Sequence, residues 1–235
     1  MPGEFSQVDW SFIKTRLDEV SEQIAAKGAT VLRPVRITPP ISSSQITEFE
    51  SATGLRVPPE LSSYLTEYSG GWEFYWSLTR AGQTRESVNP PKGCWLANFG
   101  GGPFLLHQED TSLLAHFTEM QRFFEEFRPD DKESEMILRH SIPLTPFWAG
   151  VDGDYCVLRL DTDPAEIVYA DHEAGWHIRP EHKLGVGFRD FLVRWAEVAF
   201  PGFEYLTHSE VALLTETGSS EQERNWLEWL SGART

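Results

Sequence analysis

The side chains with the clearest chemical potential lie between Gly150 and Gly175, where seven acidic residues accompany a single basic one. Such a density of carboxylates attracts a basic protein surface and repels the phosphates of nucleic acids. Its aspartate pairs could form turns or bind Ca²⁺, but neither pair continues into a calcium loop that ends in glutamate. We therefore favour turn-forming aspartates and predict a partner-binding surface made of Asp152, Asp154, Asp161, Asp163, Asp171 and Glu173.

Cys156 and His172 lie in the same stretch and could form a nucleophile and its base. A change of one residue in strand register decides whether their side chains face each other. Cys156 shares its predicted strand face with two leucines, however, which favours a buried and unreactive thiol. The five-residue spacing of His172, His177 and His182 would place successive rings on opposite faces of a strand, which is no metal-binding pattern. We predict no catalytic residue, no metal site and no cofactor.

Glycine-rich segments occur at Gly100-Gly101-Gly102 and at Gly185-x-Gly187. A phosphate-binding loop needs glycines in a fixed frame before a helix, with Lys and Ser or Thr for a nucleotide. The first segment lacks that frame and the second is only a fragment of it, so both are predicted to be turns. The chain contains neither a G-x-S-x-G nucleophile turn nor an H-E-x-x-H metal-binding helix. An enzyme is therefore not predicted, and a hydrolase that uses Cys156 or the histidines is the least favoured reading.

Trp72, Phe74 and Trp76 alternate with Glu73 and Tyr75, and this period of two predicts a strand. The first three side chains are expected to face the core. An aromatic ring on the other face, near acidic groups, is a suitable anchor for a basic partner, so Tyr75 is added to the predicted binding residues. The alternative, in which the aromatic residues of this strand serve the core alone, stays open.

A β-hairpin is predicted to position the acidic stretch. Two apolar runs, Tyr155 to Leu160 and Ile167 to Ala170, flank the turn cluster Asp161 to Pro164. The face with Cys156 suits a core, and the face with Val157 suits a half-wet surface.

Helices and weaker strands follow from apolar spacing and from the positions of Gly and Pro. Three helices are expected in the first part of the chain: Trp10 to Ile24 with Asp9 as cap and Gly28 as stop, the cap Ser44 to Gly54, and Pro58 to Gly70. Three more are expected later: about Asp110 to Phe127, Phe188 to near Pro201, and a tail helix with Ser220 and Glu223 as a capping box. Weaker strand signals stand at Ala29 to Ile41, mostly a connector, at Ile137 to Trp148, an irregular or edge strand, and at Trp176 to Ile178. This order predicts an α+β fold with a mainly antiparallel sheet.

The composition indicates an acidic globular protein. The formal net charge of −16 either attracts basic partners or simply keeps the chain in solution. The two cysteines, Cys94 and Cys156, fit a reducing compartment. No signal peptide and no membrane span is predicted, and the expected location is the cytoplasm.

The order of the elements resembles the SUKH superfamily, which contains fungal cell-wall and killer-toxin-resistance regulators and many bacterial immunity proteins. The resemblance rests on Ile46 to Trp72 (ITEFESATGLRVPPELSSYLTEYSGGW), Gly150 to Asp161 (GVDGDYCVLRLD), Glu166 to Glu173 (EIVYADHE) and Phe188 to Trp195 (FRDFLVRW). It implies one SUKH-like domain over residues 46–200, preceded by a helix and connector in 1–45 and followed by a helical extension in 201–235.

The resemblance implies a binding module rather than a catalyst. Among bacterial members such a module is commonly an antidote to a toxin, so the expected function is an immunity protein whose acidic face covers a basic toxin domain. The alternative is a housekeeping regulatory or scaffold protein that binds an endogenous partner. No direct contact with nucleic acid or membrane is expected, and the oligomeric state is left open.

Overall fold

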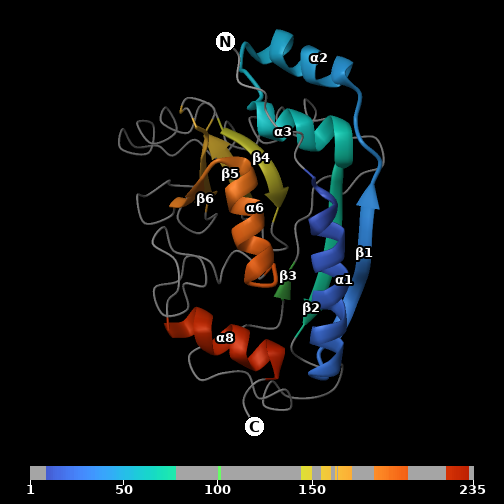
Figure 1. The fold of residues 1–235 in the computed structure, drawn as a ribbon. Helices are drawn as coiled ribbons and strands as arrows, with labels where there is room; N and C mark the ends of the chain where they lie inside the picture. Colours follow the sequence, from blue (N-terminus) through green and yellow to red (C-terminus); the bar gives the residue numbers. More distant parts are fainter. Residues whose placement is uncertain are drawn as a thin grey trace, which may run out of the picture.

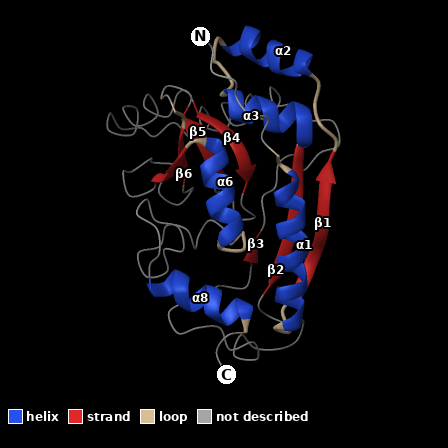
Figure 2. Ribbon diagram, viewed as in Figure 1, coloured by secondary structure: helices blue, strands red, loops and turns tan. Residues whose placement is uncertain are grey.

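A computed structural model describes residues 9–77, 100–101, 144–149, 155–159, 162, 164–170, 183–200 and 221–232. Within these residues helices pack on two antiparallel sheets, so the fold is α+β as predicted (Figure 2). The N-terminal sheet has the strand order β1-β2-β3, and the hairpin sheet has the order β4-β5-β6-β7. Figure 1 shows α1 alongside β1 and β2, α6 beside the strands of the hairpin sheet, and α8 beyond the end of α6.

Helix α1, Ser11–Ala26, confirms the first predicted helix, but its N-cap is Trp10 rather than the predicted Asp9. Hydrogen bonds from Ser11, whose backbone amide lies 2.9 Å from Asp9 Oδ1, lower the pKa of the Asp9 carboxyl at the start of the helix. The helix stops before Gly28, which has a φ of 80° that suits glycine. Its buried face matches the predicted periodicity and consists of Ile13, Leu17, Val20 and Ile24.

Strand β1, Thr30–Thr38, occupies most of the segment that was predicted to be mainly a connector. It pairs with β2, Gly71–Ser77, along its length, with register shifts between Val31 and Arg33 and between Arg33 and Arg36. Pairing therefore overrides the weak local signal. On β2 the prediction is confirmed, because Trp72, Phe74 and Trp76 are all buried. The two-residue strand β3, Gly100–Gly101, pairs with β2, so these glycines do not form the predicted turn.

Helix α2, Ser43–Thr53, ends at Gly54 as predicted, but its cap is Ser42 rather than Ser44. The Ser42 backbone amide donates to Gln45 Oε1 at 3.0 Å, as in a capping box. Helix α3, Pro59–Ser63, continues into one π-helical turn, η1, Tyr64–Tyr68.

The chain reverses tightly between η1 and β2. A side chain at Gly70 would lie 2.9 Å from Ile41 Cγ2 and 3.0 Å from the Pro39 carbonyl, so only glycine fits there. Next to it, the Ser69 hydroxyl donates to the Thr38 carbonyl at 3.0 Å and accepts from the Gly71 amide at 2.9 Å. These bonds tie the start of β2 to the end of β1.

The hairpin sheet contains β4, Leu144–Ala149, β5, Tyr155–Arg159, β6, Glu166–Ala170, and β7, Lys183–Val186. Strand β4 has a register shift between Pro146 and Trp148 and lies at the edge of the described sheet, as predicted. Strand β7 was not predicted, and it places Gly185 in a strand rather than a turn. The predicted strand Trp176 to Ile178 and the predicted helix from Asp110 lie outside the described residues.

Strands β5 and β6 confirm the predicted hairpin, but one expectation about its faces is wrong. Val157 and Leu158, which are neighbours on opposite faces of β5, are both fully buried. Ile167 and Val168 on β6 are likewise buried on both faces. The central residues of the hairpin are therefore buried on both faces, and the predicted half-wet face does not exist at these positions.

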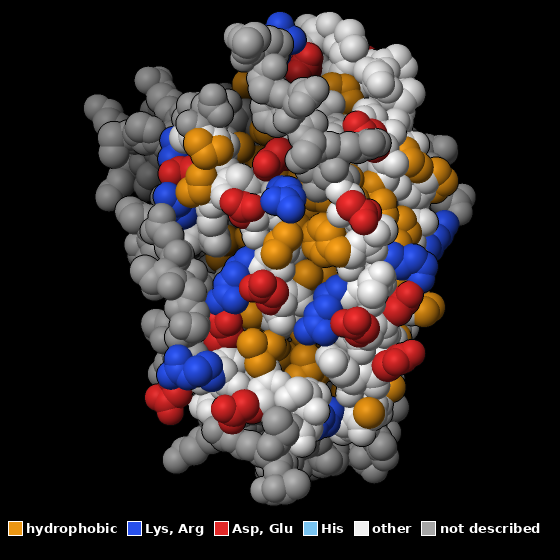
Figure 3. All heavy atoms as spheres, viewed as in Figure 1, with side chains coloured by type: hydrophobic (Ala, Val, Ile, Leu, Met, Phe, Trp, Pro, Cys, Tyr) orange, Lys and Arg blue, Asp and Glu red, His pale blue; other side chains and the backbone are white. Residues whose placement is uncertain are grey.

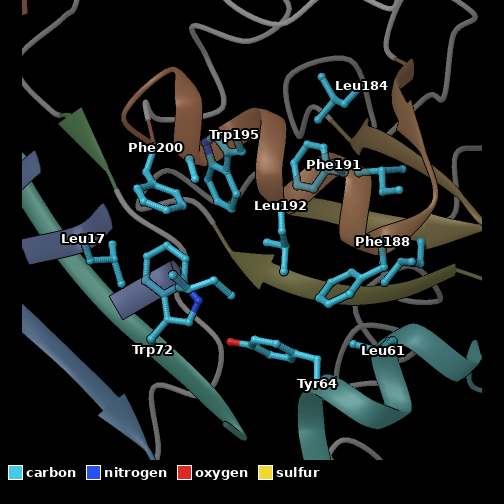
Figure 4. Close-up of a cluster of buried hydrophobic side chains, with 14 of the residues drawn as sticks. Leu17, Leu61, Tyr64, Trp72, Leu184, Phe188, Phe191, Leu192, Trp195 and Phe200 are labelled. Carbon is cyan, nitrogen blue, oxygen red and sulfur yellow. The ribbon is translucent and has the colours of Figure 1, made fainter. Parts of the chain in front are cut away.

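Helix α6, Phe188–Glu197, confirms the predicted late helix and joins the two sheets through its buried aromatic side chains (Figure 4). The Trp195 ring lies 6.0 Å from Trp72 of the N-terminal sheet, 5.4 Å from Phe191 and 5.7 Å from Phe200. Ala199 and Phe200 follow the helix with positive φ values of 67° and 50°, which cost about 1 to 2 kcal/mol per residue. Complete burial of Phe200 against these rings offsets that strain.

Helix α8, Glu221–Ser231, confirms the predicted tail helix. Trp226 stacks on Trp76 with 5.9 Å between ring centroids and donates from Nε1 to the Val198 carbonyl at 2.8 Å. The Glu223 carboxylate, expected in a capping box, pairs with Arg194 of α6. The proposed cap Ser220 lies outside the described residues. Helix α8 is thus packed into the core through an aromatic stack and an ion pair.

Candidate functional site

The hairpin of β5 and β6 is the element that would position the predicted binding residues. Tyr155 lies opposite Ala170, and Arg159 lies opposite Glu166. The chain therefore enters β5 and leaves β6 at one end of the hairpin, the open end, and passes from β5 to β6 at the other, the turn end. The strand length separates these two ends by roughly 14 Å.

All six predicted carboxylates lie outside the described residues. In chain order, two of them precede β5, two belong to the connection between the strands, and two follow β6. The segments that hold Asp152, Asp154, Asp171 and Glu173 therefore join the hairpin at its open end, and Asp161 and Asp163 belong to the connection at its turn end. The acidic stretch thus divides into two groups that the sequence alone had treated as one surface.

The described residues at the turn end carry more positive than negative charge. Glu166 pairs with Arg159 at 3.1 Å and with Lys183 of β7 at 3.2 Å. Thr162 closes the turn, because its hydroxyl donates to the Arg159 carbonyl and accepts from the Glu166 amide. The sequence analysis counted Glu166 with the acidic residues and missed Lys183. The pairing of Glu166 with Arg159 could have been predicted, because the two residues lie symmetrically on either side of the predicted turn.

Position 75 lies in the middle of the N-terminal sheet, where its backbone pairs with Arg33 of β1 and with Gly101 of β3. The side chain of Tyr75 lies outside the described part of the structure. Its role as an aromatic anchor therefore stays a prediction.

The candidate nucleophile Cys156 has a defined backbone position on β5, opposite Tyr169 of β6 and Trp148 of β4. Its side chain and all three candidate histidines, His172, His177 and His182, lie outside the described residues. Burial of the thiol thus remains a prediction. Among the residues that the structure describes, His, Cys, Asp and Glu side chains form no group of three or more that could hold a metal ion.

The segment Gly185-x-Gly187 leads into the N-terminus of α6. A carboxylate of the chain, that of Glu60, already occupies this helix end. Glu60 Oε2 of α3 accepts a hydrogen bond of 3.1 Å from the Arg189 backbone amide. Gly187, with a φ of 82°, makes the turn into the helix, and a side chain there would lie 3.8 Å from the same carboxylate oxygen. A bound phosphate would meet that negative charge, so this end of α6 is a structural joint rather than an anion site.

The acidic excess of the chain is unevenly distributed. The described residues hold 11 of the 20 lysines and arginines and 15 of the 36 acidic residues, which leaves them a formal charge of −4 out of −16. On the face in Figure 3, described side chains of both signs are interspersed. Most of the formal negative charge therefore belongs to the other segments, which include the six predicted carboxylates.

Comparison of the chain with protein-family models, with curated proteins and with solved structures finds no match. In the described portion of the chain, the helices are too short or too polar to cross a membrane.

Proposed function

We propose that this chain is a non-enzymatic binding protein of the SUKH type, and specifically an immunity protein that neutralises a toxin. The carrying observation is the hairpin register: Tyr155 pairs with Ala170, so the acidic segments that precede β5 and follow β6 join the buried hairpin at the same end. The order of the SUKH-like segments along the chain supports the same assignment.

The open end is the stronger half of the proposed surface. Residues 150–154 and 171–175 contain four acidic residues and no lysine or arginine. The hairpin's other end differs, because Arg159 next to the turn and Lys183 of β7 both pair there with the single carboxylate of Glu166. A basic cleft of a toxin would therefore be attracted most strongly to the open end.

The mechanism we propose is occlusion by charge mimicry. A toxin that acts on nucleic acid needs a cationic cleft for phosphate, and carboxylates can occupy such a cleft in place of the substrate. Complementary charge of this kind chiefly raises the association rate and sets specificity, and aromatic anchors such as Tyr75 would slow dissociation. The two cysteines favour the cytoplasm as the place of action.

Co-expression tests the assignment in cells. Cells that produce the toxin encoded beside the gene for this chain should grow when the chain is produced with it and stop growing when it is absent. A housekeeping regulator or scaffold would give no protection, and that outcome would replace the immunity assignment with the alternative.

Binding kinetics with that toxin test the surface. Asp152→Asn, Asp154→Asn, Asp171→Asn and Glu173→Gln together should lower the association rate and flatten its salt dependence. Asp161→Asn with Asp163→Asn is the matched turn-end variant and should have a smaller effect per charge. Unchanged kinetics in both variants would show that the hairpin is not the interface.

A further inference from the structure

Strand β1 is the outermost described strand of the N-terminal sheet, and of the described strands it pairs with β2 alone. The side chains of Leu32, Arg33, Pro34 and Arg36 along it are exposed. Leu32 is 50% exposed, an unusual value for a large apolar side chain among the described residues. An outer strand with exposed apolar surface is a template on which a strand of another molecule can pair.

Strand β1 carries no carboxylate of its own. No acidic residue occurs between Glu22 and Glu48, although the chain as a whole has a formal charge of −16. Long-range repulsion between two copies is also screened beyond about 8 Å at physiological salt. Whatever prevents two β1 strands from pairing must therefore act at contact.

Three features of β1 act at contact. Pro34 has no backbone N–H to donate to an incoming strand. Register shifts between Val31 and Arg33, and between Arg33 and Arg36, twist the strand away from a flat edge. If two β1 strands paired antiparallel about an axis between positions 34 and 35, Arg33 of each copy would lie opposite Arg36 of the other, and like charges in that position are destabilising.

We infer that Arg33, Pro34 and Arg36 form a guard that keeps β1 from pairing with β1 of a second copy of this chain. Leu32 is the apolar contact that such pairing would bury, because the same antiparallel arrangement sets it opposite Ile37 of the other copy. The guard preserves the negatively charged protein as a single molecule even though Leu32 is exposed on the outer described strand of its N-terminal sheet. The inference concerns β1 alone and does not depend on the proposed function.

The test removes the guard from the full-length protein. Arg33→Thr, Pro34→Val and Arg36→Thr are combined in one variant, and sedimentation over a concentration series gives the molecular mass. The wild type should sediment at 26.8 kDa, and the unguarded variant should approach twice that mass. Lys14→Thr with Arg56→Thr, which removes the same charge from exposed positions on other elements, should stay at the mass of the wild type.

Two further measurements make the result decisive. Adding Leu32→Lys to the unguarded variant should return it to the single-chain mass, and hydrogen exchange in the dimer should show new protection of the β1 amides. A folded unguarded variant that stays at the wild-type mass overturns the inference, as does a wild type that already dimerises through β1. If the triple variant does not fold, Arg33→Thr with Arg36→Thr, which keeps Pro34, should still show a mass that rises with concentration, and a constant mass overturns the inference.

Discussion

The Glu60 carboxylate of α3 accepts a hydrogen bond of 3.1 Å from the backbone amide of Arg189, across 129 positions of sequence, at the N-terminus of α6. At the other end of the same helix, Arg16 of α1 donates to the carbonyls of Ala196 and Glu197 at 2.9 and 3.3 Å. A negative group thus meets the positive end of the helix dipole and a positive group meets its negative end. Helix α6, which joins the two sheets, is held at both ends by side chains of other helices.

Replacing Glu60 tests this joint. Glu60→Gln keeps a hydrogen-bond acceptor but removes the charge, and we expect it to lower the free energy of unfolding by about 0.5 to 1 kcal/mol. Urea denaturation measures the change, which should shrink at high salt because salt screens the charge. Glu67→Gln, an exposed glutamate on η1, is the control and should have no effect. Equal losses in both variants would contradict the role of Glu60 at the helix end.

The ion pair between Arg194 and Glu223 should hold α8 against α6. The Glu223 side chain is only 5% exposed. Burial acts to lower the pKa of the Arg194 guanidinium, but the hydrogen bonds that Arg194 donates to Glu223 and Glu197 raise this pKa overall. We expect Glu223→Ala to lower the free energy of unfolding by about 1 to 3 kcal/mol, because it leaves a partly buried cation short of a partner. In a double-mutant cycle with Arg194→Met, the two losses should be less than additive. Additive losses would show that the pair does not couple the helices.

Tyr64 should make the protein sensitive to alkaline pH. Its hydroxyl is buried, and no partner meets hydrogen-bond geometry with it among the described residues. Burial raises the pKa of this hydroxyl far above the ordinary value of 10.0, and the nearby Ser69 and Trp72 offset only part of that rise. The neutral hydroxyl is therefore tolerated in the folded state, whereas the unfolded chain can ionise it once the pH exceeds 10.

The resulting stability contribution is complete below pH 10 and is lost as the pH rises above it. We expect Tyr64→Phe to change the free energy of unfolding at pH 7 by no more than about 1 kcal/mol, since the lost hydroxyl has no partner to leave unsatisfied. Above pH 10 the variant should lose stability less steeply than the wild type in urea titrations. Parallel pH profiles would contradict this account. Tyr68, whose pKa burial also raises, should contribute a second, separate part of the alkaline loss.

The thiol of Cys156 is predicted to be unreactive in the folded protein. Its neighbours on β5, Val157 and Leu158, are fully buried, and burial in apolar surroundings disfavours the thiolate that reacts. In a Cys94→Ser background, labelling by a thiol reagent should be slow in native buffer and fast in urea. Rapid labelling of the native protein would revive the reading of Cys156 as a nucleophile.

Much of the fold could be predicted because the relevant signals are local. The apolar spacing of α1, the alternation on β2 and the turn cluster of the hairpin each lie within one element, and the structure confirms them. The length of β1 could not be predicted, because pairing with β2 rather than the propensity of its own residues stabilises it. The burial of Val157 was missed for a related reason, since alternation cannot tell whether a second layer covers the other face of a strand.

The sequence by itself determined the α+β class, the hairpin and the acidic character that motivates a search for a basic partner. Only the tertiary structure decided that Glu60 meets Arg189, that Lys183 joins Arg159 at Glu166, and that Arg194 meets Glu223. Hydrophobic periodicity indicates which face of a helix or strand is buried. It does not indicate which other element packs against that face. Those long-range contacts decide which of the described charges are paired within the chain.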